Sequence, residues 1–484
     1  MSIIENLEPK LVWKHFDEIR KIPRCSKHEE KIREYILDFA KKQGLKTRTD
    51  EAGNVVVIKP AAKGMENKPI VVLQGHMDMV CEKDSGVDFD FTKDPIKLKL
   101  DGDILTADGT TLGADDGIGL AISLAILEDN SLKHGPLEAL FTVDEETGLT
   151  GAFAMKNDML KGRIMLNLDS EDFGVITVGC AGGGDSKIEL PIKKQSFKSN
   201  DMENIIVTVK GLRGGHSGVD IHEQRGNAVK LLTRILWKIS NDYDFYLSDI
   251  KGGDKHNAIP REATATISVK KADKNKLINA IKAEEKDILE EYKPIDPNFN
   301  VEIENTANVK TVLTKETQNI LLNLLHGLPH GVDKMSYDIP GLVETSTNLA
   351  SIMLDDKNAV IYMSTRSSIK SALQDLRDRI HAIANLAKAK VTEEKPYPGW
   401  KPNMDSKLLA LSKKIFKEMY GKEPTIEAIH AGLETGIIGE KFPGMDMISI
   451  GPTIKYPHSP EEQVHISTVE KTYKYVLRIL EEIK

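Results

Sequence analysis

Four apolar segments with the composition of β-strands are each followed by side chains that can bind a metal ion. The segments are residues 70–73 before His76 and Asp78, 139–143 before Glu145 and Glu146, 164–168 before Asp169, and 447–450 before His458. A further carboxylate, Asp115, stands at the start of a helix-like apolar stretch. In open α/β sheets, ligands bind beyond the carboxyl ends of the strands. Imidazoles and carboxylates gathered at that edge predict a hydrolytic metal site.

His76 and Asp78 are two residues apart, so their side chains point to the same side of an extended chain. His76 can then bind the metal while Asp78 holds its other ring nitrogen or orients a nearby base. Asp115 and Asp116 open a helix, where an aspartate can simply cap free N–H groups. One of these two carboxylates can instead bridge two metal ions about 3.5–4 Å apart.

Glu145 and Glu146 are adjacent, so their side chains diverge. One can bind a metal ion while the other takes a proton from water; the alternative is an acidic loop tip. Asp169 is favoured over Glu171 and Asp172 as a ligand because it directly follows the apolar segment.

His458 lies in a proline-flanked turn, whereas His465 lies in a strand-like stretch, and loop placement favours His458 as the ligand. His216 lies in the glycine-rich segment 211–218. This segment predicts either a hairpin with an incidental histidine or a histidine that polarises the scissile carbonyl. The sequence has no G-x-S-x-G serine motif to compete with the metal site.

Length and composition bound the remaining classes of function. The 484 residues suffice for two or three domains. A net charge of −8, without a basic block, gives no reason to expect nucleic-acid binding. No apolar segment approaches the ~20 residues of a membrane span, and no signal peptide is apparent, so we expect a cytoplasmic protein. The three dispersed cysteines, without a C-x-x-C pair, argue against a disulfide framework and a thiolate zinc site.

Helix and strand patterns alternate over the first part of the chain, which predicts an α/β domain. Polar and apolar residues alternate at 205–209 and 263–269, as in half-exposed antiparallel strands. We therefore expect residues 1–186 and 398–484 to form one discontinuous catalytic domain, because His458 is needed beside His76. Residues 187–397 are expected to be an inserted α+β lid domain.

Seven segments carry a resemblance to a known family: 74–80, 108–119, 142–148, 167–171, 214–218, 430–434 and 451–460. In this order they resemble the M20 metallopeptidase clan, and most closely its aminoacyl-histidine dipeptidase branch. The resemblance covers nearly the whole chain. It implies a zinc-peptidase α/β fold, with a mixed sheet flanked by helices and an inserted lid.

The resemblance also implies a set of metal ligands. Two Zn²⁺ ions would be bound, the first by His76, Asp115 and Asp169, and the second by Asp115, Glu146 and His458. The peptide bond after the bridging Asp115 is typically cis in this clan. Asp78 would orient His76, and Glu145 would be the general base. Co²⁺ or Mn²⁺ can substitute at such nitrogen and oxygen sites.

Substrate-binding residues follow from the same resemblance: His216 for the oxyanion, and Asn257, Arg366, Gly432 and Glu434 for the subsites. A guanidinium suits a free carboxylate, and a carboxylate suits a free α-amine. The implied function is hydrolysis of L-Xaa-L-Xaa dipeptides, including Xaa-His and β-alanyl-histidine. The alternatives are an N-acyl amino acid deacylase, a tripeptide aminopeptidase or a non-catalytic peptide-binding protein; an intact general base argues against the last. The resemblance allows either a homodimer formed through the lid or a monomer.

Overall fold

The computed structural model describes residues 2–197, 201–306 and 309–484, which divide into two compact units. Unit 1 contains the described residues up to Gly179, together with Trp400–Ala428 and Leu433–Lys484. Unit 2 contains Cys180–Gly399 and Ile429–Gly432. The chain thus leaves unit 1 after its first third and returns to it for the last part.

The helices of unit 1 are α1 (Lys10–Ile19), α2 (Glu30–Lys42), α3 (Ala114–Glu128), α4 (Glu145–Gly148), α5 (Thr150–Ala154), α10 (Lys407–Tyr420), α11 (Glu434–Lys441) and α12 (Ile466–Glu482). Its strands are β1 (Lys46–Thr49), β2 (Val55–Lys59), β3 (Val71–His76), β4 (Leu98–Asp101), β5 (Ile104–Ala107), β6 (Leu137–Thr142), β7 (Ile164–Asn167), β8 (Val175–Cys180), β22 (Thr425–Ile429), β23 (Asp446–Ser449), β24 (Ile454–Lys455) and β25 (Gln463–His465).

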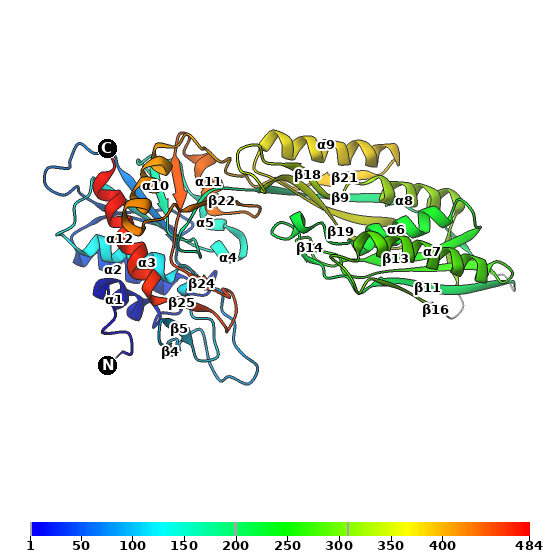
Figure 1. The fold of residues 1–484 in the computed structure, drawn as a ribbon, viewed down its shortest axis with the longest axis horizontal. Coiled ribbons are helices and arrows are strands. Elements are labelled where there is room, and N and C mark those ends of the chain that lie inside the picture. Colours follow the sequence, from blue (N-terminus) through cyan, green and yellow to red (C-terminus); the bar gives the residue numbers. More distant parts are fainter. Residues whose placement is uncertain (1, 198–200, 307–308) are drawn as a thin grey trace. The chain divides into compact units, whose positions relative to one another are not determined.

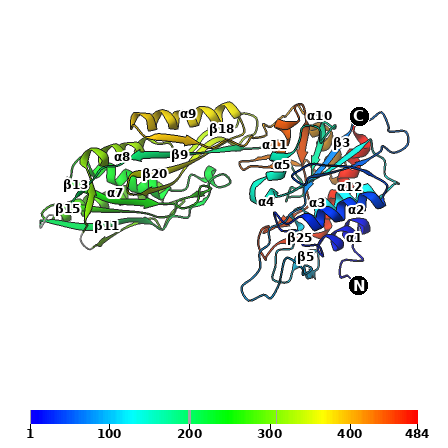
Figure 2. The ribbon, with the colours of Figure 1, turned by 180° about the vertical axis from the view of Figure 1, so that it is seen from behind.

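The main sheet of unit 1 is mixed, as expected, with strand order β1-β2-β6-β3-β7-β23-β8-β22. Its four central strands, β6, β3, β7 and β23, pair in parallel with one another, whereas β2 and β8 on either side of them are antiparallel. They are the four apolar segments that precede the candidate ligands. α12 lies in front of the sheet in Figure 1 and α2 in front of it in Figure 2, so helices cover both faces. Parallel sheets require this cover, and β3 and β6 are accordingly buried throughout.

Helix α3 packs in the core because it is apolar nearly all round, and every residue of it except the last is buried. Its first turn is irregular: Asp115 and Asp116 have non-helical backbone angles, and the Asp115–Asp116 peptide bond is cis, as expected. Strands β4 and β5 form a hairpin. With β24 and β25 it forms a second, four-stranded sheet.

The expectation of no disulfide is wrong, because Cys25 and Cys81 are bonded to each other. The two cysteines are 56 residues apart, and no local pattern in the sequence brings them together. The structure does so by pairing the backbone of Cys25 with that of Met79. An odd number of cysteines is compatible with this bond, since Cys180 stays outside it.

The helices of unit 2 are α6 (Ala228–Ile239), α7 (Lys274–Tyr292), α8 (Lys315–Gly327), α9 (Lys370–Leu386) and the 3₁₀ turn η1 (Ile221–Glu223). Its strands are β9 (Gly182–Pro191), β10 (Lys194–Ser196), β11 (Met202–Lys210), β12 (Gly215–His216), β13 (Phe245–Gly252), β14 (Ala258–Ile259), β15 (Ala263–Lys270), β16 (Asn300–Asn305), β17 (Thr311–Leu313), β18 (Gly331–Met335), β19 (Val343–Leu354), β20 (Asn358–Ser367) and β21 (Lys390–Glu393).

Unit 2 is built on an antiparallel sheet with strand order β16-β11-β15-β13-β19-β20-β9-β21. Helices α6, α7, α8 and α9 lie along it (Figure 1), and one large apolar core joins helices and strands. Side-chain caps start two of the helices: Asn227 accepts from two backbone N–H groups of α6, and Thr314 accepts from one of α8. Within the described ranges, no helix is long and apolar enough to cross a membrane.

Candidate metal and substrate site

The parallel pairing of β6, β3, β7 and β23 places their carboxyl ends at one edge of the sheet. His76 is the last residue of β3, and Asp169 follows β7 by two residues. Glu145 and Glu146 open α4 just beyond β6. The residues that sequence spacing singled out therefore come together for a simple geometric reason: parallel strands end on the same side.

One group of candidate ligands surrounds the buried imidazole of His76. Its Nε2 lies 3.1 Å from Oδ1 of Asp115 and 3.3 Å from Oδ1 of Asp169. On the other side of the ring, Nδ1 lies 3.3 Å from Oδ1 of Asp78. Burial disfavours the charged imidazole, but Asp169, Asp115 and Asp78 outweigh it and hold the pKa of His76 well above its ordinary value.

A second group shares Asp115 with the first. Oδ2 of Asp115 lies 3.1 Å from Nε2 of His458, which is itself 3.0 Å from Oε2 of Glu146. These two hydrogen bonds raise the pKa of His458 to about 11, and the bond to Asp115 contributes more than the bond to Glu146. The His458 side chain is 51% exposed, whereas that of His76 is 1% exposed, so only the second group has a solvent-exposed histidine. The two oxygens of one carboxylate thus face two different histidines.

His458 has a φ of 60°, in a region that non-glycine residues seldom adopt and that costs about 1–3 kcal/mol. The surrounding loop therefore holds the imidazole in a specified place. His465, the alternative considered from the sequence, is on β25 and lies 3.9 Å from Asp103, away from both groups. Glu171 is not in either group. Its pKa is nevertheless raised to about 8, mainly by burial and then by the negative charge of Asp115.

Asp78 connects His76 to the loop that carries the two glutamates. Its Oδ1 and Oδ2 accept hydrogen bonds from the backbone N–H groups of Glu145 and Glu146, at 3.1 and 3.2 Å. The hydroxyl of Ser26 donates a third bond. Although burial opposes ionisation, the bonds to His76 and these donors lower the pKa of Asp78 to about 2. An ionised Asp78 therefore fixes both His76 and the start of α4.

Glu145 lies beside the first group, because its carboxylate is close to both His76 and Glu146. Burial raises the pKa of its carboxyl well above the ordinary value. A carboxyl with a raised pKa beside a metal site is suited to accept and return a proton near neutral pH.

Glu434 is buried at the first residue of α11 and is held by a chain of polar side chains that the sequence did not reveal. Its Oε2 accepts from Nε2 of Gln74 at 2.7 Å and from the hydroxyl of Thr142 at 2.6 Å. Asn167 in turn donates to Oε1 of Gln74, and Ser449 donates to Asn167. Among the described side chains, Oε1 of Glu434 is one of the few buried oxygens without a hydrogen-bond partner, so it can bind a ligand cation.

Unit 2 brings three of its predicted residues together around a short antiparallel pair, β12 and β14. His216 pairs with Ala258, and the carbonyl of Asn257 accepts from Ser217 N–H at 2.8 Å. The Asn257 side chain is exposed. A Cβ on Gly218 would lie 2.2 Å from the carbonyl oxygen of His430, and also 3.1 Å from Cε1 of His216 and 3.2 Å from Nε of Arg366, so no side chain fits there.

Arg366 is buried on β20, and its Nη1 donates to the hydroxyl of Tyr397 at 2.9 Å. The Tyr397 ring also packs against Gly432, where a Cβ would approach Cε2 to 2.9 Å. Nε of Arg366 has no hydrogen-bond partner among the residues that the structure describes. A buried guanidinium with a free donor is suited to bind an anion. Nothing in the sequence near Tyr397 indicated this contact with Arg366.

Arg24 was also missed, because nothing near it in the sequence suggests a role. It is buried, and its guanidinium donates to the carbonyl groups of Met77, Asp78 and Gly113. It therefore joins the loop after β3 to the turn before Asp115.

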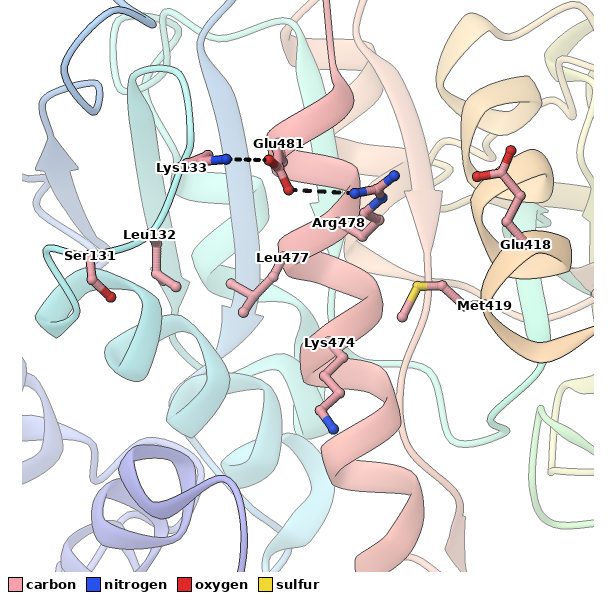
Figure 3. Close-up of a pocket in the computed structure, with 9 residues that line it drawn as sticks. All are labelled: Ser131, Leu132, Lys133, Glu418, Met419, Lys474, Leu477, Arg478 and Glu481. Carbon is pink, nitrogen blue, oxygen red and sulfur yellow. Dashed lines mark hydrogen bonds and ion pairs between the residues drawn. The ribbon is translucent and has the colours of Figure 1, made fainter.

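The donor sets fit metal ions. Each of the two groups offers one imidazole nitrogen and two carboxylates, the ligands of zinc and related transition metals. Oε1 of Glu146 is buried and has no hydrogen-bond partner among the described residues, so it can serve as a ligand atom. A separate cavity of about 590 Å³ in unit 1, lined by α12 and the segment 131–133 (Figure 3), contains none of the predicted site residues. It holds ion pairs such as Lys133–Glu481 and no cluster of ligands.

Comparisons with known proteins agree with this geometry. The family model "Peptidase family M20/M25/M40" matches residues 72–482. Over 484 residues the chain is 42% identical to the cytosol non-specific dipeptidase of Escherichia coli K12. The alignment covers 100% of this chain and 99% of that protein.

Solved structures show the same relationship. The aminoacylhistidine dipeptidase of Vibrio alginolyticus superposes with a TM-score of 0.95 at 42% identity, over 100% of this chain and 98% of that chain. The aminopeptidase PepT of Bacillus cereus shares the fold, with a TM-score of 0.56 and 16% identity over 99% of each chain. Family match, full-length identity and fold lead to one conclusion: this chain belongs to peptidase family M20/M25/M40.

Proposed function

We propose that this chain is a cytosolic di-zinc dipeptidase that hydrolyses L-Xaa-L-Xaa dipeptides, including Xaa-His and β-alanyl-histidine. One observation carries the proposal: the two oxygens of Asp115 face His76 and His458, and the half-buried Glu145 lies beside His76. Full-length similarity to proteins named as dipeptidases supports the substrate class, and the name of the Escherichia coli relative supports the location.

The residues would divide the work as follows. His76, Asp115 and Asp169 would hold one zinc ion, and Asp115, Glu146 and His458 the other; Co²⁺ or Mn²⁺ can occupy the same ligands. When bound, the ions lower the pKa of a water molecule and polarise the substrate carbonyl.

Glu145 is the proton carrier of the proposed reaction. Its carboxylate takes a proton from the attacking water, whose oxygen forms a bond to the carbonyl carbon. The C–N bond then breaks, and Glu145 returns the proton to the leaving amine nitrogen. Asp78 keeps His76 and the backbone of Glu145 in place through the contacts described above.

Recognition of both substrate ends would distinguish a dipeptidase from its alternatives. We propose that Glu434, with its unpaired Oε1, binds the free α-amine, and that Arg366, with its unpaired Nε, binds the free carboxylate. His216, Asn257 and Gly432 would complete the subsites, with His216 donating to the developing oxyanion. Unit 2 would then be the lid predicted at residues 187–397.

The experiment compares metal-depleted protein with protein resupplied with zinc. We expect hydrolysis of β-alanyl-L-histidine and of L-dipeptides only after resupply. N-acetylated and C-amidated versions of the same dipeptides should be cleaved poorly, since each lacks one charged end. Cleavage restricted to N-acylated substrates, or to tripeptides, would replace this proposal with a deacylase or a tripeptide aminopeptidase.

Glu145→Gln tests the catalytic role against mere peptide binding. We expect kcat to fall about 10²–10⁴-fold while the zinc content stays at the wild-type level. Glu51→Gln is the matched control, because Glu51 is an exposed glutamate of the same unit. A fully active Glu145→Gln variant would refute the proposed proton transfer, and dipeptide binding without turnover by the zinc-loaded wild type would favour a binding protein. Light scattering on the same samples measures whether the chain forms a homodimer.

A further inference from the structure

Glu462 makes an arrangement of hydrogen bonds that none of the proposed catalytic steps uses. Its buried carboxylate accepts from four consecutive backbone N–H groups in the turn that leads into the first residues of α3. Oε2 accepts from Leu112 at 2.8 Å and from Gly113 at 2.9 Å. Oε1 accepts from Ala114 at 2.7 Å and from Asp115 at 3.2 Å. The last of these donors is the backbone of the shared metal-ligand candidate.

The opposite side of the same turn is held by Arg24. Its Nη2 donates to the carbonyl of Gly113, and its Nη1 donates to the carbonyl of Met77 at 3.1 Å. Gly113 has a φ of 68°, and a Cβ there would lie 2.7 Å from Nη2 of Arg24. The turn is therefore fixed between a carboxylate and a guanidinium, and a side chain at Gly113 does not fit.

Glu462 also belongs to the loop that carries His458. Both residues lie between β24 and β25, and the backbone N–H of Glu462 donates to the carbonyl of Ser459 at 3.0 Å. Strand β25 begins directly after Glu462 and pairs with β5, which leads into the turn before Asp115. One side chain thus joins two loops whose ligands are 343 residues apart in sequence.

We propose that Glu462 is a positioning residue that sets the spacing of Asp115 and His458, and with it the affinity for the metal ion held by Asp115, Glu146 and His458. This inference rests on the proposed function. A carboxylate is needed because only acceptors can face four N–H donors. Glutamine offers a single acceptor oxygen, and its NH₂ group would point at two of the backbone donors.

The test uses Glu462→Gln, with Glu461→Gln as the control because Glu461 is the exposed acid next to it. Zinc stoichiometry and affinity are measured by competition with a chelator, and the ligand environment by the absorption spectrum of the cobalt-loaded enzyme. We expect one of the two ions to bind about 10–100-fold more weakly in Glu462→Gln, the range for outer-shell partners. At saturating zinc, kcat should fall while KM changes little. Glu461→Gln should behave as wild type.

Glu462→Asp provides the conservative variant. It retains both oxygens and the charge on a shorter side chain, so metal affinity should lie between those of wild type and Glu462→Gln. If Glu462→Gln does not fold, this variant carries the test against Glu461→Gln. Wild-type affinity for both ions in every Glu462 variant would overturn the inference, as would an equal loss of both ions accompanied by a lower melting temperature of the metal-free protein. Wild-type protein that binds fewer than two zinc ions would instead overturn the proposed function.

Discussion

The two units of this chain gather polar side chains in different ways. In unit 1 most of them follow the carboxyl ends of parallel strands, and they contact one another: Asp115 bonds to two histidines, and Asp78 bonds to a histidine and two amides. In unit 2, His216 lies in an antiparallel strand pair, Arg366 lies within β20, and Gly432 lies in the short segment 429–432. Nε of Arg366 lacks a hydrogen-bond partner among the described residues. In the proposed function, unit 1 therefore holds the metal ions and the substrate amine, and Arg366 of unit 2 binds the substrate carboxylate.

The largest test of this contrast is Asp115→Asn. The amide is neutral and leaves one oxygen for two histidines, so we expect both zinc ions to be lost. Metal ions contribute several kcal/mol to the reaction, so kcat/KM should fall by about 10³-fold or more. Metal analysis and initial rates measure both effects, with the exposed Asp88→Asn as control. Retention of two zinc ions would contradict a shared carboxylate.

A second test separates the units by stability. The Cys25–Cys81 bond lies in unit 1, so its reduction should lower the free energy of unfolding of that unit by about 2–4 kcal/mol. The transition of unit 2 should not move. Calorimetry of metal-free protein, with and without reductant, measures this, and a Cys25→Ser/Cys81→Ser variant should no longer respond to reductant. Three titratable thiols in the unreduced, unfolded chain would contradict the bond.

Arg366→Lys tests the role assigned to unit 2. Lysine cannot reproduce a bidentate contact, and a hydrogen bond to a charged group contributes about 1.5–3 kcal/mol. We therefore expect kcat/KM for a free dipeptide to fall by about 10–100-fold, mainly through KM, with zinc content unchanged. Arg379→Lys serves as control, because Arg379 is a partly exposed arginine of the same unit. A matching loss for the C-amidated substrate would argue against carboxylate recognition.

The smallest expected effect is the pH dependence due to Glu434. Burial raises the pKa of this carboxyl to about 8, although the bond from Thr142 opposes the shift. Below that pH the group is protonated and cannot pair with an ammonium ion, so kcat/KM should rise about fivefold from pH 7 to pH 8. Above pH 8 the substrate amine loses its own charge. In Glu434→Gln this rise should be absent, and an unchanged profile would remove Glu434 from amine binding.

Much of the candidate site could be predicted because it depends on local features. The apolar segments, their parallel pairing and the side chains that follow them bring His76, Glu145, Glu146 and Asp169 to one edge of the sheet. Because this pattern occurs four times in the sequence, a metal site was a better explanation than chance placement of the side chains. The helix α3 could be predicted for the same reason, since the apolar stretch after Asp115 is a local signal.

The sequence by itself therefore determined the types of ligand and the strands that carry them. The preference for His458 over His465 also came from the sequence, which places the second in a strand-like stretch. Only the tertiary structure decided which partners meet across long separations: Cys25 with Cys81, Gln74 with Glu434, and Glu462 with the turn at 112–115. The physical reason is that strand pairing and loop packing between distant segments set these contacts, and neither leaves a periodic pattern in the sequence.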